Sequence, residues 1–213
     1  MNPHAQPRIR LWLVRHAQPL IEPGICYGQL DVAADAAASQ QAAQQLAQAL
    51  PDDCMIWHSP LQRCELLELE FITQKACSTP NPPTSHADSR LMEMNFGAWE
   101  GMSWDVIART QIDAWANDLA HVAPGGGENL QQMLARVDQA LRQTLAASGD
   151  ITDRVWITHA GVIRCVQWLL QHGQQLPTAA QWQLPAPACG QWICLPLEVN
   201  EISAYLAGAS AAS

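Results

Sequence analysis

The stretch Leu11-Trp12-Leu13-Val14-Arg15-His16-Ala17 is a short apolar run that ends in a histidine. A second stretch, Val155-Trp156-Ile157-Thr158-His159-Ala160-Gly161, repeats this pattern much later in the chain. Continuous apolar runs of this length are typical of strands buried in a parallel sheet. Because the carboxyl ends of neighbouring parallel strands meet at one crevice, we expect His16 and His159 to lie close together.

The rest of the chain alternates strand-like runs with helical segments. This alternation predicts an α/β fold of three layers, in which helices cover both faces of a mostly parallel central sheet. A Pro-rich loop is expected over Thr79–Ser85, and Pro124–Gly127 should break the chain before a long amphipathic helix. Strands are predicted at Ile9–Val14, Cys54–Trp57, Val155–Thr158 and Trp192–Leu195. Helices are predicted at Asp35–Leu50, at Ser59–Phe71 with Ser59 as N-cap and Pro60 in the first turn, at Trp104–Trp115, from Leu130 up to Gly149, and at Val162–Gln171.

Length and composition indicate one globular domain that spans residues 1–213. Hydrophobic residues make up 48% of the chain and charged residues 15%, a balance that supports a full core. Residues 1–8 and the Ala-rich segment 204–213 are expected to be loose termini. The first ten residues lack the apolar run of a signal peptide, and no stretch is apolar for long enough to predict a membrane span.

The charge balance limits the classes of partner. Eleven basic and 20 acidic residues give a net charge of −9, which disfavours binding to nucleic acid or to an anionic membrane. Any anion site must therefore come from a local cluster of the few basic residues. The seven cysteines are odd in number and contain no CxxC pair, which favours reduced thiols in the cytoplasm over disulfides or a metal site.

Five motif-like segments follow one another along nearly the whole chain. They are Leu13–Ala17, Ser59–Arg63, Arg90–Gly101, Pro124–Glu128 and Thr158–Arg164. In this order they resemble the motifs of the histidine phosphatase superfamily, the group that includes phosphoglycerate mutases and acid-type phosphatases. The resemblance implies a phosphoglycerate mutase-like fold and the hydrolysis of a small-molecule phosphate ester without a metal or cofactor.

The resemblance also assigns a role to the polar residues of these segments. His16 would be the nucleophile that forms a phosphohistidine, and a following backbone carbonyl would fix the tautomer of its ring. Arg15, Arg63 and His159 would bind the phosphoryl oxygens and stabilise the charge of the transition state. Glu93 would protonate the leaving alcohol and then accept a proton from the attacking water.

The segment Gly24–Val32 resembles the Cys-Tyr-Gly-x-x-Asp segment of alpha-ribazole phosphatases, which remove a 5′-phosphate during cobalamin biosynthesis. Glu100 is expected to stabilise the start of the helix at Trp104, and Trp99 and Trp104 are expected to serve packing. Ala17 stands where the superfamily commonly has Gly, and a departure of this kind affects the choice of substrate more than the reaction. The residues expected to contact substrate are Arg15, Gln18, Cys26, Tyr27, Gly28, Arg63 and His159.

Other functions fit the same residues less well. A phosphoglycerate mutase-type isomerase would return the phosphoryl group to its substrate, but the chain is short for that class. A non-catalytic phosphate-binding module is disfavoured by the intact set of catalytic residue types. A broad-specificity small-molecule phosphatase is an alternative, and the sequence leaves open whether the chain forms a homodimer.

Overall fold

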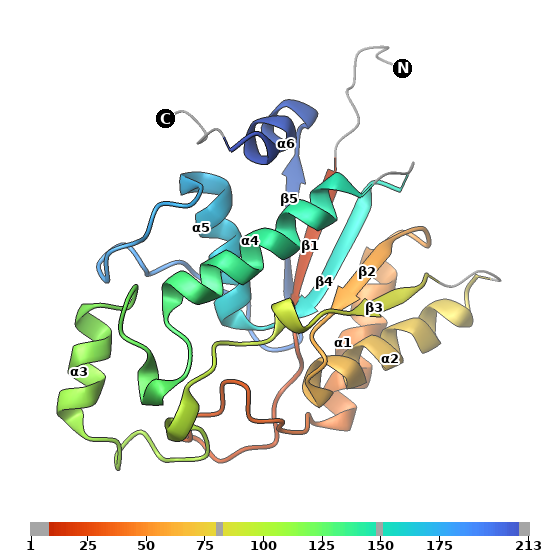
Figure 1. Ribbon diagram of the computed structural model, residues 1–213. Helices are drawn as coiled ribbons and strands as arrows, with labels where there is room; N and C mark the ends of the chain where they lie inside the picture. Colours follow the sequence, from red (N-terminus) through yellow and green to blue (C-terminus); the bar gives the residue numbers. More distant parts are fainter. Residues whose placement is uncertain (1–8, 80–82, 148–150, 209–213) are drawn as a thin grey trace.

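The computed structural model describes residues 9–79, 83–147 and 151–208, and a five-stranded sheet forms its centre (Figure 1). The strand order is β3-β2-β4-β1-β5. Neighbouring strands are parallel except at one edge, where β5 runs antiparallel to β1. The mostly parallel sheet confirms the predicted fold class. The strands are β1 (Ile9–Arg15), β2 (Met55–His58), β3 (Ser85–Ala87), β4 (Asp153–Thr158) and β5 (Trp192–Leu197).

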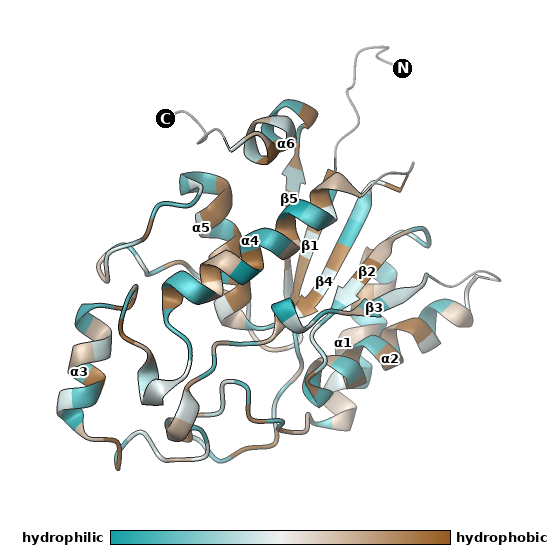
Figure 2. Ribbon diagram, in the orientation of Figure 1, coloured by the Kyte–Doolittle hydropathy of each residue, from teal (hydrophilic) through white to brown (hydrophobic). Residues whose placement is uncertain are grey.

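Helices cover both faces of this sheet, as predicted. On one face, α1 (Ala36–Ala49) and α2 (Gln62–Ala76) pack against Trp12 and Val14 of β1. On the other face, Leu11 and Leu13 of the same strand face the core formed with α4 (Leu130–Ala146), α5 (Ala160–His172) and α6 (Val199–Leu206). The alternation of side chains along β1 thus supplies both cores. Figure 2 shows β4 hydrophilic at its start and hydrophobic further along, where it lies between these layers.

A smaller aromatic cluster lies beside the carboxyl ends of the strands. It contains Phe96, Trp99, Trp104 and Trp115, and the last of these belongs to α3 (Arg109–Asn117). The rings meet edge to face, except for Trp104 and Trp115, which stack with centroids 6.3 Å apart. The chain around this cluster forms short 3₁₀ turns at Ser89–Leu91, Gly97–Trp99 and Pro124–Gly126.

Two helices begin later than the sequence predicted. The helix expected from Ser59 to Phe71 is α2, which begins at Gln62 and continues to Ala76. Ser59 does not cap it: the N-cap residue is Leu61, and the Ser59 hydroxyl contacts His159 and the N–H of Leu61 ahead of the helix. The helix expected from Trp104 begins only at Arg109, since the backbone N–H of Trp104 donates to the Gly24 carbonyl and its ring packs into the aromatic cluster. In both places tertiary contacts outweigh local signals for a helix start.

The remaining differences lie in loops and at the ends. Part of the predicted Pro-rich loop lies outside the described residues, and the short strand β3 begins at its last residue, Ser85. α4 ends at Ala146, earlier than predicted, and the predicted stop at Gly149 lies outside the described residues. Residues 204–206, expected to be loose, belong to α6, where Ile202 and Tyr205 are buried against the core. No helix in the described ranges is long and apolar enough to cross a membrane.

Candidate active site

His16 and His159 lie side by side where β1 and β4 end, as predicted, with ring centroids 5.1 Å apart. The backbone N–H of His16 donates to the Thr158 carbonyl at 2.9 Å, so the first residue after β1 stays in register with the last residue of β4. The two rings are tilted by 56° to each other, and both are buried. Parallel pairing of the two strands therefore brings together residues from distant parts of the chain.

The ring of His16 is held in one tautomer. Its Nδ1 lies 2.7 Å from the carbonyl oxygen of Ala17, which can only accept a hydrogen bond, so Nδ1 carries the proton. Burial is the main cause that lowers the pKa of His16; the bond to Ala17 opposes it, the charges of Arg63 and Arg15 add to it, and the resulting pKa is about 3. The ring is therefore neutral at physiological pH, with an unshared electron pair on Nε2. The predicted carbonyl that fixes the tautomer is Ala17.

His159 has protein partners at both ring nitrogens. Its Nε2 lies 2.8 Å from the Ser59 hydroxyl, and the Arg63 Nε–H donates to its Nδ1 at 3.3 Å. Burial lowers the pKa of His159 well below its usual value, and the charge of Arg63 adds to this effect. His159 is therefore a second neutral imidazole. A direct contact with a phosphoryl oxygen would require one of these hydrogen bonds to break.

Arg63 is fully buried in the first turn of α2. Its Nη2 and Nη1 donate to the backbone carbonyls of Gly28 and Leu30 at 2.6 and 2.9 Å, and its guanidinium lies 5.5 Å from the centre of the Tyr27 ring. None of its described partners is a carboxylate. Burying a charge without a counter-charge is costly, so this position favours an anion close by.

Arg15, the last residue of β1, is a second cation without a described carboxylate partner. One of its terminal nitrogens, Nη1, donates to the Pro187 carbonyl at 3.0 Å. Its Nε is buried and has no hydrogen-bond partner among the described residues. An unpaired buried donor is costly, and an anion bound beside it would satisfy it.

The Glu93 carboxylate is fixed by two backbone N–H groups. The N–H of Gly161, in the first turn of α5, donates to Oε2 at 3.0 Å, and that of Met94 donates to Oε1 at 2.9 Å. A Cβ at position 161 would come within 2.1 Å of Oε1, so only glycine leaves room for this carboxylate. Gly161, two positions after His159, therefore has a direct function in placing the Glu93 carboxylate.

A salt bridge between Arg136 and Glu128 supports the backbone of Glu93. Arg136 binds both oxygens of Glu128 at 2.6 and 2.8 Å, and it also donates to the carbonyls of Arg90, Met92 and Glu93. Glu128 ends the Pro124–Glu128 motif, and Gly125 and Gly127 of that motif pack backbone to backbone on the loop after Glu93. The motif therefore positions the loop and does not itself line the catalytic cavity.

A cavity of about 180 Å³ lies between these groups, and we call it the catalytic cavity. All five residues predicted to be catalytic line it, together with three further residues predicted to contact substrate, namely Cys26, Tyr27 and Gly28. Sequence reasoning missed Ile25, Phe96 and Trp104. The full lining is Arg15, His16, Ile25, Cys26, Tyr27, Gly28, Arg63, Glu93, Phe96, Trp104 and His159.

Gln18 does not line the catalytic cavity. Its side chain is exposed and lies in a shallow groove beside α1, because the chain turns there to bring the Gln18 carbonyl to the N–H of Asp35, the N-cap of α1.

Cys26 is buried against Trp99, and burial, with the nearby Glu100 carboxylate, raises the pKa of its thiol to about 12. It is therefore a neutral part of the cavity wall.

Two residues next to the catalytic cavity, Glu100 and Cys64, make contacts that the sequence did not indicate. One oxygen of Glu100 accepts from the backbone N–H groups of both Gln29 and Phe96, at 2.9 and 2.8 Å, and so joins two loops. The helix that Glu100 was expected to stabilise does not begin there. The Cys64 thiol lies 3.5 Å from His159 Nε2 and is fully buried beneath it. Neither contact has a signal in local sequence.

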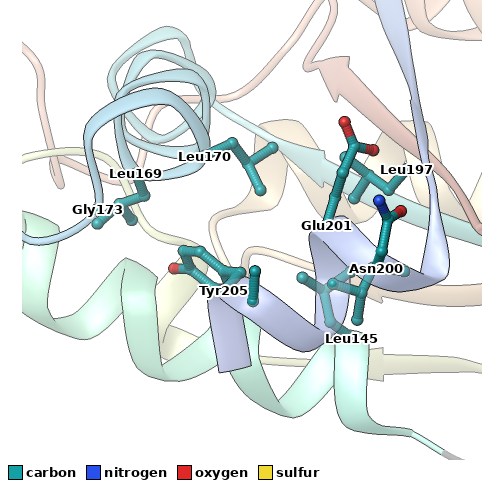
Figure 3. A pocket seen from close by; sticks show the side chains of 10 residues that line it. Leu145, Leu169, Leu170, Gly173, Leu197, Asn200, Glu201 and Tyr205 are labelled. Carbon is teal, nitrogen blue, oxygen red and sulfur yellow. The ribbon is translucent and has the colours of Figure 1, made fainter. Parts of the chain in front are cut away.

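A larger cavity of about 370 Å³ lies elsewhere, between α4, α5 and α6 (Figure 3). Leucines from α4 and α5 line it, with Tyr205 between them and Glu201 and Asn200 on α6. It contains none of the residues predicted to be catalytic. In the described residues, no group of three or more His, Cys, Asp or Glu side chains could hold a metal ion.

Residues 11–201 match the model of the histidine phosphatase superfamily (branch 1). The chain belongs to this superfamily. A cavity that holds the neutral His16 beside two arginines without described carboxylate partners is consistent with this membership. The family does not by itself select a substrate.

Solved structures with the same fold include phosphatases of different substrates. A mycobacterial glucosyl-3-phosphoglycerate phosphatase is 24% identical, with a TM-score of 0.71 over 87% of this chain and 90% of that one. The alpha-ribazole phosphatase from Shigella flexneri is 22% identical, with a TM-score of 0.72 over 89% and 94%. A protein described as mycobacterial hydrolase 2 is 25% identical, with a TM-score of 0.71 over 89% and 82%. No curated protein matches this chain in sequence.

Proposed function

We propose that this protein is a phosphomonoester hydrolase that acts through a phosphohistidine at His16, with alpha-ribazole 5′-phosphate as the favoured substrate. One observation carries the proposal. The His16 ring is neutral, its Nδ1–H is bound to Ala17, and its Nε2 is left to attack, in a cavity with two arginines that have no carboxylate partner among the described residues. The Cys26-Tyr27-Gly28 segment, which lines that cavity, supports the favoured substrate.

The residues can perform the reaction in two steps. In the first, His16 Nε2 attacks phosphorus, the bond to the alcohol oxygen breaks, and Glu93 gives that oxygen a proton. In the second, water attacks the phosphohistidine, Glu93 takes a proton from it, and the P–N bond breaks to restore His16. Each Glu93 oxygen accepts one backbone N–H and keeps a lone pair for this proton.

The arginines would act mainly on the transition state. Arg63 and the Nε of Arg15 are already buried and, among the described residues, neither arginine has a carboxylate to leave when the phosphoryl group arrives. Preorganised donors of this kind cost no reorganisation at the moment of transfer, and each is worth on the order of 10²-fold in rate. No step in this scheme uses a metal or cofactor.

A cytoplasmic location, action on a small-molecule ester without nucleic-acid or membrane partners, and self-association as a homodimer remain parts of the proposal to be tested. All seven cysteines are free, which suits a reducing compartment. Size-exclusion chromatography with light scattering of the purified full chain would determine the oligomeric state.

A panel of phosphomonoesters, assayed with and without EDTA, tests the proposed activity. We expect release of inorganic phosphate with the highest kcat/KM for alpha-ribazole 5′-phosphate, and no effect of EDTA. A preference for glucosyl-3-phosphoglycerate would overturn the substrate and keep the chemistry. Isomerisation of 3-phosphoglycerate would indicate a mutase, and activity lost in EDTA and restored by a divalent ion would contradict the mechanism. Phosphate binding without turnover of any ester would indicate a binding module.

A further inference from the structure

A second cavity of about 270 Å³ shares Glu93 and Phe96 with the catalytic cavity, and we call it the side cavity. It lies between α3, the first turns of α4 and α5, and the segment that contains Trp182. Its lining is Glu93, Met94, Phe96, Trp115, Leu119, Leu130, Met133, Gly161, Arg164 and Trp182.

The aromatic cluster connects the two cavities. Trp104 lines the catalytic cavity and stacks on Trp115, which lines the side cavity. Phe96 lines both, with its ring centroid 5.6 Å from that of Trp115. Sites for small molecules usually measure roughly 300–1,000 Å³. Neither cavity alone reaches this range, whereas the two together do.

The position of Glu93 indicates which part of a substrate the side cavity would hold. In the proposed reaction Glu93 protonates the leaving oxygen, so the alcohol must lie on the Glu93 side of the phosphorus atom. Glu93 and Phe96 are the two residues that line both cavities. The alcohol group therefore extends from the catalytic cavity toward the side cavity.

The lining of the side cavity is mostly aromatic and apolar, and Trp115 and Arg164 bring side-chain N–H donors to it. The Nε1–H of Trp115 is buried and has no hydrogen-bond partner among the described residues. Arg164 donates through Nε to the Leu184 carbonyl, and neither of its terminal nitrogens has a hydrogen bond to another described residue. A flat ring that carries hydrogen-bond acceptors would fill the apolar space and satisfy such donors.

We propose that the side cavity binds the alcohol part of the substrate, and that it selects alcohols with an aromatic ring, such as nucleosides, over small aliphatic alcohols. This inference rests on the proposed phosphomonoesterase activity, because only that reaction places a leaving alcohol beside Glu93. It makes Trp182 and Trp115 specificity-determining residues.

Two esters that differ only beyond the reacting atoms test the inference. Propyl phosphate and 3-phenylpropyl phosphate release alkoxides of nearly equal basicity, so a difference between them reports binding of the ring. We expect the full-length enzyme to prefer 3-phenylpropyl phosphate about tenfold or more in kcat/KM, the scale of hydrophobic pocket discrimination. Trp182→Ala should remove most of this preference, and Trp182→Phe should restore part of it.

Two further variants keep the test interpretable. Leu119→Phe fills the side cavity without removing a packed ring, and it should lower the same preference even if Trp182→Ala folds poorly. Trp57→Ala is the matched control, because Trp57 is a partly buried tryptophan on β2 that lines neither cavity. The control should keep the preference of the native enzyme.

The outcomes separate the two proposals. If the native enzyme hydrolyses neither ester while inorganic phosphate still binds, the proposed function is wrong. If it hydrolyses both with equal kcat/KM, or if Trp182→Ala and Leu119→Phe both keep the preference for the aromatic ester, only the role of the side cavity is wrong.

Discussion

Arg63 and Arg154 are buried arginines at opposite ends of the same sheet, Arg63 beyond the carboxyl ends of the strands and Arg154 at the start of β4. Each donates to two backbone carbonyls. Arg154 donates to the carbonyls of Thr144 and Ala147 at the end of α4, where the negative end of the helix dipole compensates its charge. Arg63 donates to the carbonyls of Gly28 and Leu30, which lie in a loop, and it also contacts the neutral ring of His159 in the catalytic cavity.

The other charged residues at the two ends of the sheet also differ in whether they have a partner of opposite charge. Toward the start of the strands, Asp153 pairs with Arg10 at 2.7 Å, and Asp138 binds Arg142 and Tyr205. At the carboxyl end, no carboxylate among the described residues pairs with Arg15 or Arg63. Charges that are paired in the folded protein serve stability, whereas charges left unpaired beside a cavity are available to a ligand. Burial of an arginine alone therefore does not identify a site.

The largest effect on catalysis apart from loss of the nucleophile is expected for Glu93→Gln. An alkyl ester needs an acid for its leaving group, so its hydrolysis should slow by roughly 10²–10⁴-fold. The kcat/KM for p-nitrophenyl phosphate, which reports phosphoryl transfer to His16, should be spared because this leaving group needs no proton, whereas its kcat should fall because Glu93 also activates the water of the second step. Gly161→Ala, whose methyl would displace the carboxylate, should show the same pattern in steady-state kinetics with both esters. Equal losses on both esters would mean that Glu93 binds substrate or supports the loop.

Arg63→Met should lower kcat/KM by on the order of 10²-fold, because it removes one preorganised donor to the transition state. The loss should appear with alkyl and aryl esters alike, in contrast to that of Glu93→Gln. Steady-state kinetics on protein whose folding is verified by circular dichroism would measure it. A loss below about threefold would place Arg63 with the structural arginines.

Arg154→Met is the matched variant at the opposite end of the sheet. It leaves two carbonyls at the end of α4 without their donor, so the free energy of unfolding should fall by about 2–4 kcal/mol. Urea denaturation would measure this change, and kcat/KM per folded molecule should stay within about twofold of the native value. A large loss of activity in the folded variant would show that the two ends are not separate in function.

The pH dependence of stability should also distinguish the two ends. The pKa of His16 is lowered to about 3, so the stability linked to its neutral form is present above about pH 6.5 and is lost as the pH falls toward 3. Although burial favours the neutral acid, hydrogen bonds from Tyr205 and Arg142 lower the pKa of Asp138, so the stability linked to that carboxylate is lost only below about pH 4.

Between pH 6.5 and 5, His16 should therefore reduce the free energy of unfolding by up to about 1.4 kcal/mol per pH unit. Urea denaturation of the native protein and of His16→Gln at pH 7, 6 and 5 would compare the two slopes. The variant should show the smaller decrease. Identical slopes would mean that His16 has an ordinary pKa in the folded protein.

Local sequence patterns predicted four of the five described strands, each a short apolar run, and the two histidines that follow β1 and β4, but they did not predict β3. They failed where distant residues decide the outcome. Ser59 has the local pattern of an N-cap, but His159, a hundred positions away, binds its hydroxyl. Trp104 precedes a helix, but its ring is held in an aromatic cluster with Trp99 of a 3₁₀ turn and Trp115 of α3.

The same limit applies to the site. His16, Arg15 and Arg63 were predicted because they lie inside motifs, and the geometry brings them into one cavity. Gln18 is next to the reactive histidine in sequence, but the turn into α1 exposes its side chain. The support of Glu93 by Arg136 depends on a contact between α4 and a loop, for which a single sequence carries no signal.

Trapping of the phosphorylated enzyme tests the central claim most directly. The native protein would be mixed with p-nitrophenyl phosphate, quenched within one turnover in alkaline denaturant, and analysed by mass spectrometry of its peptides. We predict a phosphoramidate on His16 that is stable to base and labile to acid, more abundant in Glu93→Gln and absent in His16→Asn. Continued turnover of His16→Asn, or a phosphoryl group on another residue of the native protein, would contradict the account.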